Sequence, residues 1–171
     1  MSEHGHEVRS AVSTEANRLL EIAQAAQNKL TRAGSVQQIA GYSAQNVRTR
    51  MERSELFVLE ACGNILGSAF VEPVTAERFP QIARWNAVPK GCPAWFLYGL
   101  VIHPEQQGRK WGQRLLQGIC RQIGMAAPAA LLLDCWAGNA RLRRFYTDAG
   151  FVLHGVFPEE EYEVAVFRRM L

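Results

Sequence analysis

The chain has 171 residues, of which 48% are hydrophobic and 20% are charged. These values are typical of one globular domain and exclude intrinsic disorder, which combines low hydrophobicity with high net charge. The formal net charge of +3 is too small to indicate nucleic-acid binding without a basic cluster, so we expect no nucleic-acid partner. We predict a single domain over residues 1–171.

The cysteines and the apolar segments indicate the compartment. The four cysteines form neither a C-x-x-C pair nor the Cys/His spacing of a zinc site. The longest apolar run, residues 125–133, is interrupted by Pro128 and too short to span a membrane, and no signal peptide is apparent. We therefore expect a reduced cytoplasmic protein with no metal and no membrane partner.

The first third of the chain predicts a strand and two helices. Residues 6–12 resemble a short strand, and Ser13 is the expected N-cap of the helix that follows. Apolar residues recur in that helix every three or four positions, at Leu19, Ile22, Ala26 and Leu30. Gly34 is the expected stop, and a second helix is predicted within residues 42–54, capped by Ser43.

The middle of the chain predicts a hairpin, a long connection and a buried strand. Residues 55–72 contain two β-rich runs around an expected Gly63-Asn64 turn. Residues 73–93 contain four prolines and no hydrophobic period, so we expect a long connection of the kind that is usually functional or mobile. The apolar run at residues 95–102 predicts a strand covered on both faces.

The second half alternates between helix and strand. Apolar residues recur every four positions in the next helix, at Trp111, Leu115, Ile119 and Ile123. An apolar strand at 130–136, a helix at 140–149 and a hairpin ending in the strand 162–170 follow. Right-handed crossovers then imply a parallel strand pair inside a mixed sheet, so the predicted fold class is α/β.

The segment HPEQQGRKWGQRLL, residues 103–116, links the buried strand to its helix. A strand, a glycine turn and a helix N-terminus together present unpaired N–H groups to an anion. Gly108 and Gly112 permit close approach of a ligand to the backbone, and Arg109 and Lys110 add positive charge. Ordinary strand-to-helix turns have the same residues, so local chemistry leaves both interpretations open.

Two motifs resemble the GNAT superfamily of acetyl-CoA-dependent N-acetyltransferases. LVIHPEQQGRKWGQRLL is similar to the family's acetyl-CoA signature, in which L-x-V-x-P precedes Q/R-x-x-G-x-G/A. The six signature positions are Gln107, Gly108, Arg109, Lys110, Trp111 and Gly112. NARLRRFYTDAGF, residues 139–151, is similar to the family's N-x-x-A/L-x-x-F/L-Y-x-x-x-G-F segment. The likeness in element order covers nearly the whole chain, and the specific motifs lie within about residues 98 to 151.

The resemblance implies a GNAT-like fold. Its sheet is mixed and mostly antiparallel, with about six or seven strands, about four flanking helices and a splayed parallel strand pair. Lys110 departs from the family pattern, which usually has glycine there. We expect a helical φ at Lys110 and retained coenzyme A binding, because a side chain makes positive φ costly. Trp111 is expected to fill the core.

The resemblance also implies roles for the cofactor-binding residues. Backbone N–H groups from Gln107 to Gly112 hold the pyrophosphate, and the backbone of Leu100, Val101 and Ile102 pairs with the pantetheine arm and polarises the thioester carbonyl. Asn139 contacts that arm, although an N-cap bonded to the N–H of Leu142 or Arg141 is the simpler interpretation. The Tyr146 hydroxyl protonates the departing thiolate, although its position also suits the core.

The sequence offers three candidates for the proton acceptor of the attacking amine. Glu72 at a strand end, Asp134 in an apolar strand and Tyr98 are candidates, and each also has a purely structural interpretation. Cys120 and Cys135 have no neighbouring histidine in the sequence, which argues against an acyl-cysteine route.

The predicted function is transfer of an acetyl group from acetyl-CoA, as cosubstrate, to a primary amine by direct attack on the thioester, without metal. The acceptor, a small molecule or a peptide, stays unidentified because acceptor choice depends on variable loops. The alternative is a coenzyme A-binding module with a regulatory or structural role and no transferase activity. Homodimer formation is left open.

Overall fold

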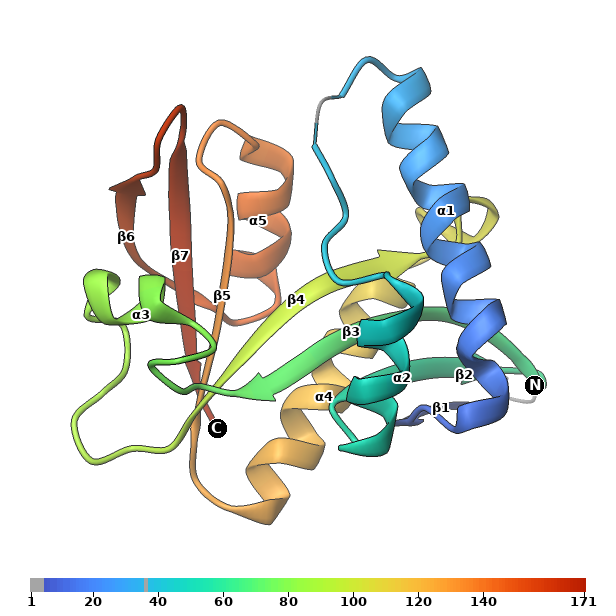
Figure 1. Ribbon diagram of the computed structural model, residues 1–171, viewed down its shortest axis with the longest axis horizontal. Helices are drawn as coiled ribbons and strands as arrows, with labels where there is room; N and C mark the ends of the chain where they lie inside the picture. Colours follow the sequence, from blue (N-terminus) through green and yellow to red (C-terminus); the bar gives the residue numbers. More distant parts are fainter. Residues whose placement is uncertain (1–4, 36) are drawn as a thin grey trace. The chain divides into compact units, whose positions relative to one another are not determined.

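The computed structural model describes residues 5–35 and 37–171 (Figure 1). Its strands are β1 (His6–Ser10), β2 (Leu56–Ala61), β3 (Asn64–Pro73), β4 (Ala94–Ile102), β5 (Ala130–Trp136), β6 (Val152–Pro158) and β7 (Glu163–Met170). Its α-helices are α1 (Ala16–Arg32), α2 (Ala44–Glu52), α3 (Pro80–Trp85), α4 (Trp111–Ala126) and α5 (Ala140–Asp148). Two 3-10 turns, η1 (Ser13–Glu15) and η2 (Pro104–Gln106), precede α1 and follow β4.

The strands form one mixed sheet in the order β1-β2-β3-β4-β5-β7-β6. The β1–β2, β2–β3, β5–β7 and β6–β7 pairs are antiparallel, and β4 and β5 are parallel. The α/β fold class and the parallel pair are therefore confirmed. The parallel ladder runs only from the pair Ala94 and Ala130 to the pair Phe96 and Leu132, although β4 continues to Ile102 and β5 to Trp136.

The chain divides into two compact units. The first contains the residues up to Val71 and Tyr98–Ile119, and the second contains Glu72–Leu97 and Cys120–Leu171. In the first unit, α1 buries the predicted stripe at Leu19, Ile22 and Ala26, and helix α2 adds Val47 and Met51 to the core. In the second unit, β5 is fully apolar over its first four residues and buries all of them.

Helix α3 corrects the expectation of an irregular connection over residues 73–93. Pro80 occupies the first helical turn, where its missing N–H costs nothing. Phe79, Ile82 and Trp85 are buried at a spacing of three, and Phe79 and Trp85 pack against Phe96 of β4. Six residues are too few to show a hydrophobic period, so the sequence pattern missed this helix.

Two local predictions were also wrong. The β2–β3 turn consists of Cys62 and Gly63, with φ of 51° and 73°, and Asn64 already pairs with Ala61. A two-residue type I′ turn requires positive φ at both positions, which places the turn one residue earlier than expected. At the start of the first helix, Ser13 is not the N-cap: the N-cap of η1 is Val12 and that of α1 is Glu15. The Glu15 carboxylate accepts the Val12 N–H at 2.8 Å.

Other local predictions are confirmed. The Ser43 hydroxyl accepts the Asn46 N–H as an N-cap, and Gly34 follows α1 with a φ of 80°. The predicted C-terminal hairpin is formed by β6 and β7, which pair in antiparallel orientation.

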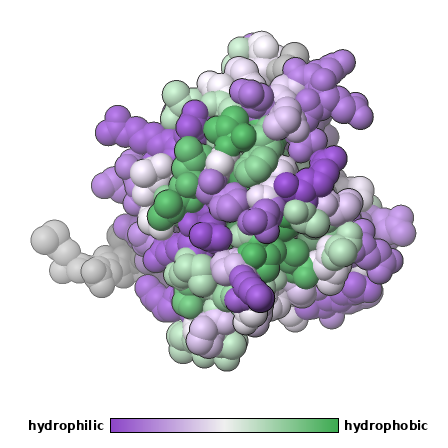
Figure 2. Space-filling model, turned by 90° about the vertical axis from the view of Figure 1, so that its left-hand side faces the viewer, coloured by the Kyte–Doolittle hydropathy of each residue, from purple (hydrophilic) through white to green (hydrophobic). Residues whose placement is uncertain are grey.

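Strand β6, an edge strand of the sheet, has exposed apolar side chains. Val152 is 70% exposed, and Leu153 and Val156 are also exposed. Figure 2 shows one face of the molecule on which hydrophobic patches are separated by hydrophilic side chains. Among the residues that the structure describes, no helix is long and apolar enough to span a lipid bilayer.

Candidate active site

Strand β4 changes direction at Gly99, just before the predicted pantetheine-binding residues. Gly99 has a φ of 62°, which lies in the left-handed region that side chains rarely adopt. Its carbonyl accepts a hydrogen bond from the Tyr42 hydroxyl at 2.7 Å. After this kink, Val101 is buried, and Leu100 and Ile102 are half-buried.

The loop after β4 is held by side chains at both of its ends. The Gln107 amide nitrogen donates to the Ile102 carbonyl at 3.1 Å, and the Gln107 amide oxygen accepts from the Lys29 ammonium at 2.7 Å. His103 accepts the Glu105 N–H and caps η2. The loop is therefore braced against α1 as well as closed on itself.

The loop presents backbone N–H groups at the start of α4. The first hydrogen bond of the helix runs from the Arg114 N–H to the Lys110 carbonyl at 3.1 Å, so the N–H groups of Trp111, Gly112 and Gln113 precede the helical ladder. Gly108 and Lys110 both have positive φ, 81° and 62°. Alternation of right- and left-handed residues turns successive N–H groups toward one point, which suits an anion.

The backbone of Lys110 corrects the sequence prediction. A helical φ was expected, and the residue is instead left-handed. The chain must turn from η2 into α4 within four residues, and left-handed positions at Gly108 and Lys110 accomplish this turn. Gly108, Arg109 and Lys110 are all exposed, and a Cβ added at Gly108 would have no heavy atom within 4 Å.

Trp111 is half-buried, not a core residue as expected. The Arg114 guanidinium lies 4.8 Å from the centre of its ring, and the His6 ring lies 6.0 Å away. In the described part of the chain its buried indole N–H has no hydrogen-bond partner. Trp111 thus packs at the first turn of α4 against His6 of β1.

Residues of the second motif lie in the other compact unit. The Asn139 side chain accepts the Leu142 N–H at 3.0 Å, which confirms the N-cap interpretation. Its amide NH₂ group is not needed for this bond and remains a donor. Asn139 is half-buried at the start of α5.

Tyr146 is buried on α5 among aromatic rings. Its ring centre lies 5.8 Å from that of Phe167 and 6.2 Å from that of Phe151. Burial raises the pKa of the Tyr146 hydroxyl above its ordinary value, and the ionised forms of Cys135 and Asp134 raise it further by repulsion. The phenol is therefore protonated at neutral pH.

Asp134 lies half-buried on β5, close enough to Tyr146 to affect its titration. Burial raises the pKa of Asp134 to about 6, and the nearby Glu159 carboxylate adds to the rise. Glu159 itself lies 3.5 Å from the Arg84 guanidinium of α3. Asp134 thus changes charge near pH 6.

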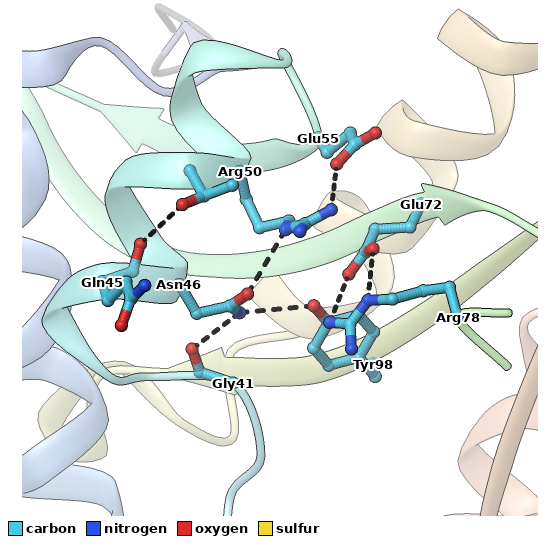
Figure 3. Close-up of polar contacts among 9 residues, drawn as sticks. Gly41, Gln45, Asn46, Arg50, Glu55, Glu72, Arg78 and Tyr98 are labelled. Carbon is cyan, nitrogen blue, oxygen red and sulfur yellow. Dashed lines mark hydrogen bonds and ion pairs between the residues drawn. The ribbon is translucent and has the colours of Figure 1, made fainter.

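Glu72 is only 1% exposed, and an ion pair occupies its carboxylate. The Arg78 Nε and Nη2 atoms donate to its two oxygens at 2.9 and 3.1 Å (Figure 3). A bidentate guanidinium stabilises the ionised carboxylate and competes with any proton that it would accept. Asp134 is therefore better suited than Glu72 to be the base.

The third candidate, Tyr98, takes part in a chain of polar contacts in the first unit (Figure 3). Its hydroxyl accepts from the Asn46 amide at 3.4 Å, and the Asn46 oxygen accepts from Arg50 Nε at 3.3 Å. Arg50 also pairs with the buried Glu55 at 2.6 Å. This chain orients the side chains of α2 relative to β4.

Sequence reasoning missed several residues of this region. Tyr42, Lys29 and Arg78 each contact a predicted site residue or its neighbour. Tyr42 contacts a residue 57 positions away and Lys29 one 78 positions away, beyond the reach of any local pattern. Arg78 is only six positions from Glu72, but it lies in the connection that we expected to be irregular.

Comparison with known proteins decides the family. A family model described as an acetyltransferase (GNAT) domain matches residues 52–153, more than half of the chain. The chain belongs to the GNAT family. The matched region includes the glycine loop, Asp134, Asn139 and Tyr146. A search of curated proteins found no significant match.

Solved structures are similar in fold to nearly the whole of this GNAT-family chain. A GNAT-family acetyltransferase from Listeria monocytogenes is 18% identical with a TM-score of 0.75, and the match covers 97% of this chain and 95% of that one. The PaiA N-acetyltransferase of Thermoplasma acidophilum, solved with coenzyme A, is 16% identical with a TM-score of 0.69 and coverage of 98% and 99%. The ribosomal-protein-S18-alanine N-acetyltransferase of Escherichia coli is 17% identical with a TM-score of 0.68 and coverage of 97% and 94%.

Proposed function

We propose that this GNAT protein is an N-acetyltransferase that moves the acetyl group of acetyl-CoA to a primary amine. The observation that carries the proposal is the exposed loop Gln107–Lys110, which has two left-handed residues and leads into the unpaired N–H groups at the start of α4. This arrangement is suited to a pyrophosphate. The GNAT family match over the same residues supports acetyl-CoA as the donor. The fold likeness over 97% of the chain supports one acyltransferase domain.

Each proposed contact with acetyl-CoA follows from the chemistry of the residue. Backbone N–H groups of the loop bind the pyrophosphate, and Arg109 and Lys110 add positive charge beside it. The backbone of Leu100–Ile102 pairs with the pantetheine amides as an added strand would. The amide NH₂ group of Asn139, which its capping bond does not use, is a donor for the pantetheine arm.

The proposed reaction is direct attack. Asp134 accepts a proton from the acceptor ammonium, and its pKa of about 6 leaves it mostly ionised at neutral pH. The amine nitrogen then bonds to the thioester carbon, and the carbon–sulfur bond breaks. Tyr146 gives its proton to the departing thiolate, and the second proton lost by the nitrogen replaces it. Cys135 does not carry the acetyl group in this proposal, because burial raises the pKa of its thiol to about 11 and keeps it protonated.

The acceptor is a primary amine of a small molecule or a peptide. The Escherichia coli neighbour is named for an alanine of a ribosomal protein, which is a peptide acceptor, but its 17% identity supports only the fold. The acceptor class therefore follows from the reaction, and the individual acceptor has to be found by screening.

The test measures thiol release from acetyl-CoA against a panel of polyamines, amino acids and peptides with free N-termini. We expect at least one amine to accelerate release. Tyr146→Phe should lower kcat by about a hundredfold or more, as loss of a general acid does, without weakening acetyl-CoA binding. Clear acetyl-CoA binding with no acceleration by any amine would favour the alternative, a coenzyme A-binding module without transferase activity.

A further inference from the structure

The Tyr42 hydroxyl joins two neighbouring strands of the first unit. It donates to the Gly99 carbonyl of β4 at 2.7 Å and lies 2.8 Å from the Ser68 hydroxyl of β3. Ser68 is completely buried. A buried hydroxyl pair that ends on a backbone carbonyl is costly to break, because each group would lose its partner without gaining water.

The segment before Tyr42 packs directly on the kinked part of β4. A Cβ at Gly99 would come within 2.6 Å of the Ala40 carbonyl oxygen. A Cβ at Gly41 would come within 2.7 Å of both the Phe70 and Tyr98 rings. The absence of a Cβ at Gly99 therefore permits the close approach of the Ala40 backbone, and its absence at Gly41 makes room for the two rings. Both glycines have positive φ, which residues with a side chain rarely adopt.

Aromatic packing holds the Tyr42 ring in one orientation. The Phe70 ring lies edge-to-face with Tyr42 at 4.8 Å and stacks on Tyr98 at 4.9 Å. Phe70 is itself completely buried. The Tyr42 hydroxyl thus reaches Gly99 from a rigid position, not from a mobile side chain.

The bond to Gly99 also determines the direction of the next N–H group. The Gly99 carbonyl and the Leu100 N–H belong to the same peptide plane and point in opposite directions in a trans peptide. Fixing the carbonyl on one side of β4 therefore aims the Leu100 N–H toward the other side. Leu100 is one of the residues proposed to meet the pantetheine arm and the thioester.

We infer that Tyr42 is a positioning residue for acetyl transfer: its hydroxyl fixes the Gly99–Leu100 peptide and so aims the Leu100 N–H at the bound thioester. This inference rests on the proposed acetyltransferase function. A preorganised N–H donor stabilises charge that develops on the thioester oxygen, so its orientation affects the rate more than the affinity.

The test is Tyr42→Phe, which keeps the ring and removes only the hydroxyl. We expect kcat to fall about tenfold, with KM for acetyl-CoA changed less than twofold, as for an interaction made mainly in the transition state. Tyr162→Phe, at a tyrosine that is 55% exposed in the turn before β7, is the matched control and should leave both constants unchanged. A purely structural Tyr42 would lower the melting temperature and leave kcat unchanged below it, and that result would overturn the inference.

A second measurement does not depend on turnover. In protein labelled with ¹⁵N-leucine, acetyl-CoA should shift the Leu100 amide resonance in the wild type and shift it much less in Tyr42→Phe. Equal shifts in both proteins would contradict the inference even if no acceptor amine were found. Absence of turnover in the wild type, with the difference in shift retained, would contradict the proposed function alone.

Discussion

The Lys29 ammonium donates a hydrogen bond to the Gln107 amide oxygen at 2.7 Å, although the two residues are 78 positions apart. Helix α1 thereby reaches the first residue of the proposed phosphate loop. Because Gln107 also donates to the Ile102 carbonyl, the contact braces the loop at the end of β4. It also brings a third cation to a loop that already carries Arg109 and Lys110.

Lys29→Met should weaken acetyl-CoA binding by about three- to tenfold, because it removes a brace and a positive charge close to the phosphates. The difference in acetyl-CoA affinity between Lys29→Met and the wild type should shrink as salt is raised from 50 mM to 500 mM, because salt screens the charge. The difference that remains at high salt is the contribution of the hydrogen bond to Gln107. Titration calorimetry at several salt concentrations measures both effects. Lys90→Met, at an exposed lysine of the other unit, is the matched control. Equal affinities of the two variants would contradict a role for Lys29.

Gly108→Val should abolish acetyl-CoA binding and leave the fold intact. The new side chain meets no protein atom within 4 Å, but it occupies the space in front of the loop and disfavours the φ of 81°. Gly34→Val is a close control, since Gly34 has a φ of 80° and equally open surroundings. Calorimetry and circular dichroism on both variants compare binding with folding. Unchanged affinity of Gly108→Val would overturn the proposed phosphate loop.

Lys110→Gly should stabilise the protein by about 1 kcal/mol, because a left-handed lysine costs roughly 1–2 kcal/mol and glycine adopts this φ freely. Acetyl-CoA binding should persist, since the backbone N–H groups remain. Arg109→Gly is the contrasting variant, because Arg109 is not among the residues with positive φ and gains no relief from strain. Urea denaturation of both variants gives the free energies of unfolding. A less stable Lys110→Gly would show that the lysine side chain stabilises the loop.

Asp134 should set the acidic limb of the pH–rate profile. Its pKa of about 6 predicts that kcat falls as pH drops through 6, because the protonated acid cannot accept the ammonium proton. Asp134→Asn should lower kcat strongly and remove this limb. Glu72→Gln, which alters a carboxylate engaged by Arg78, should keep the limb. A limb that stays near pH 6 in Asp134→Asn would exclude Asp134 as the base.

The pH dependence of the free energy of unfolding gives an independent measure of the Asp134 pKa. Its folded-state pKa lies above the value of 3.8 that applies when unfolded, so folding favours the protonated form. The wild type should therefore lose stability as pH rises from about 4 to about 6, and Asp134→Asn should lose less over this window. The Glu159 carboxylate also repels ionised Asp134, so Glu159→Gln should reduce the loss in the free energy of unfolding between pH 4 and pH 6. Urea denaturation at pH 4 and pH 7 gives the comparison.

Many helices, strands and motifs of this protein could be predicted because they depend on local sequence patterns. The stripe of α1, the apolar run of β5 and the strand–helix alternation of the second half follow from hydrophobic period, and they sufficed to predict a parallel pair in a mixed sheet. The Asn139 cap was predictable because a cap and its N–H partner lie three residues apart. The glycine loop and Tyr146 were recognisable because both lie in short motifs.

Only the tertiary structure decided the rest. Helix α3 depends on packing around Phe96 more than on its own period, and the left-handed Lys110 depends on how sharply the chain must enter α4. The partners of Gln107 and Gly99 come from distant segments, so no window of sequence contains both members of either pair. The sequence by itself determined which elements form and which loop has the chemistry of an anion site. The fold determined which side chains brace that loop and aim the backbone of β4, because these contacts form only after distant segments have packed together.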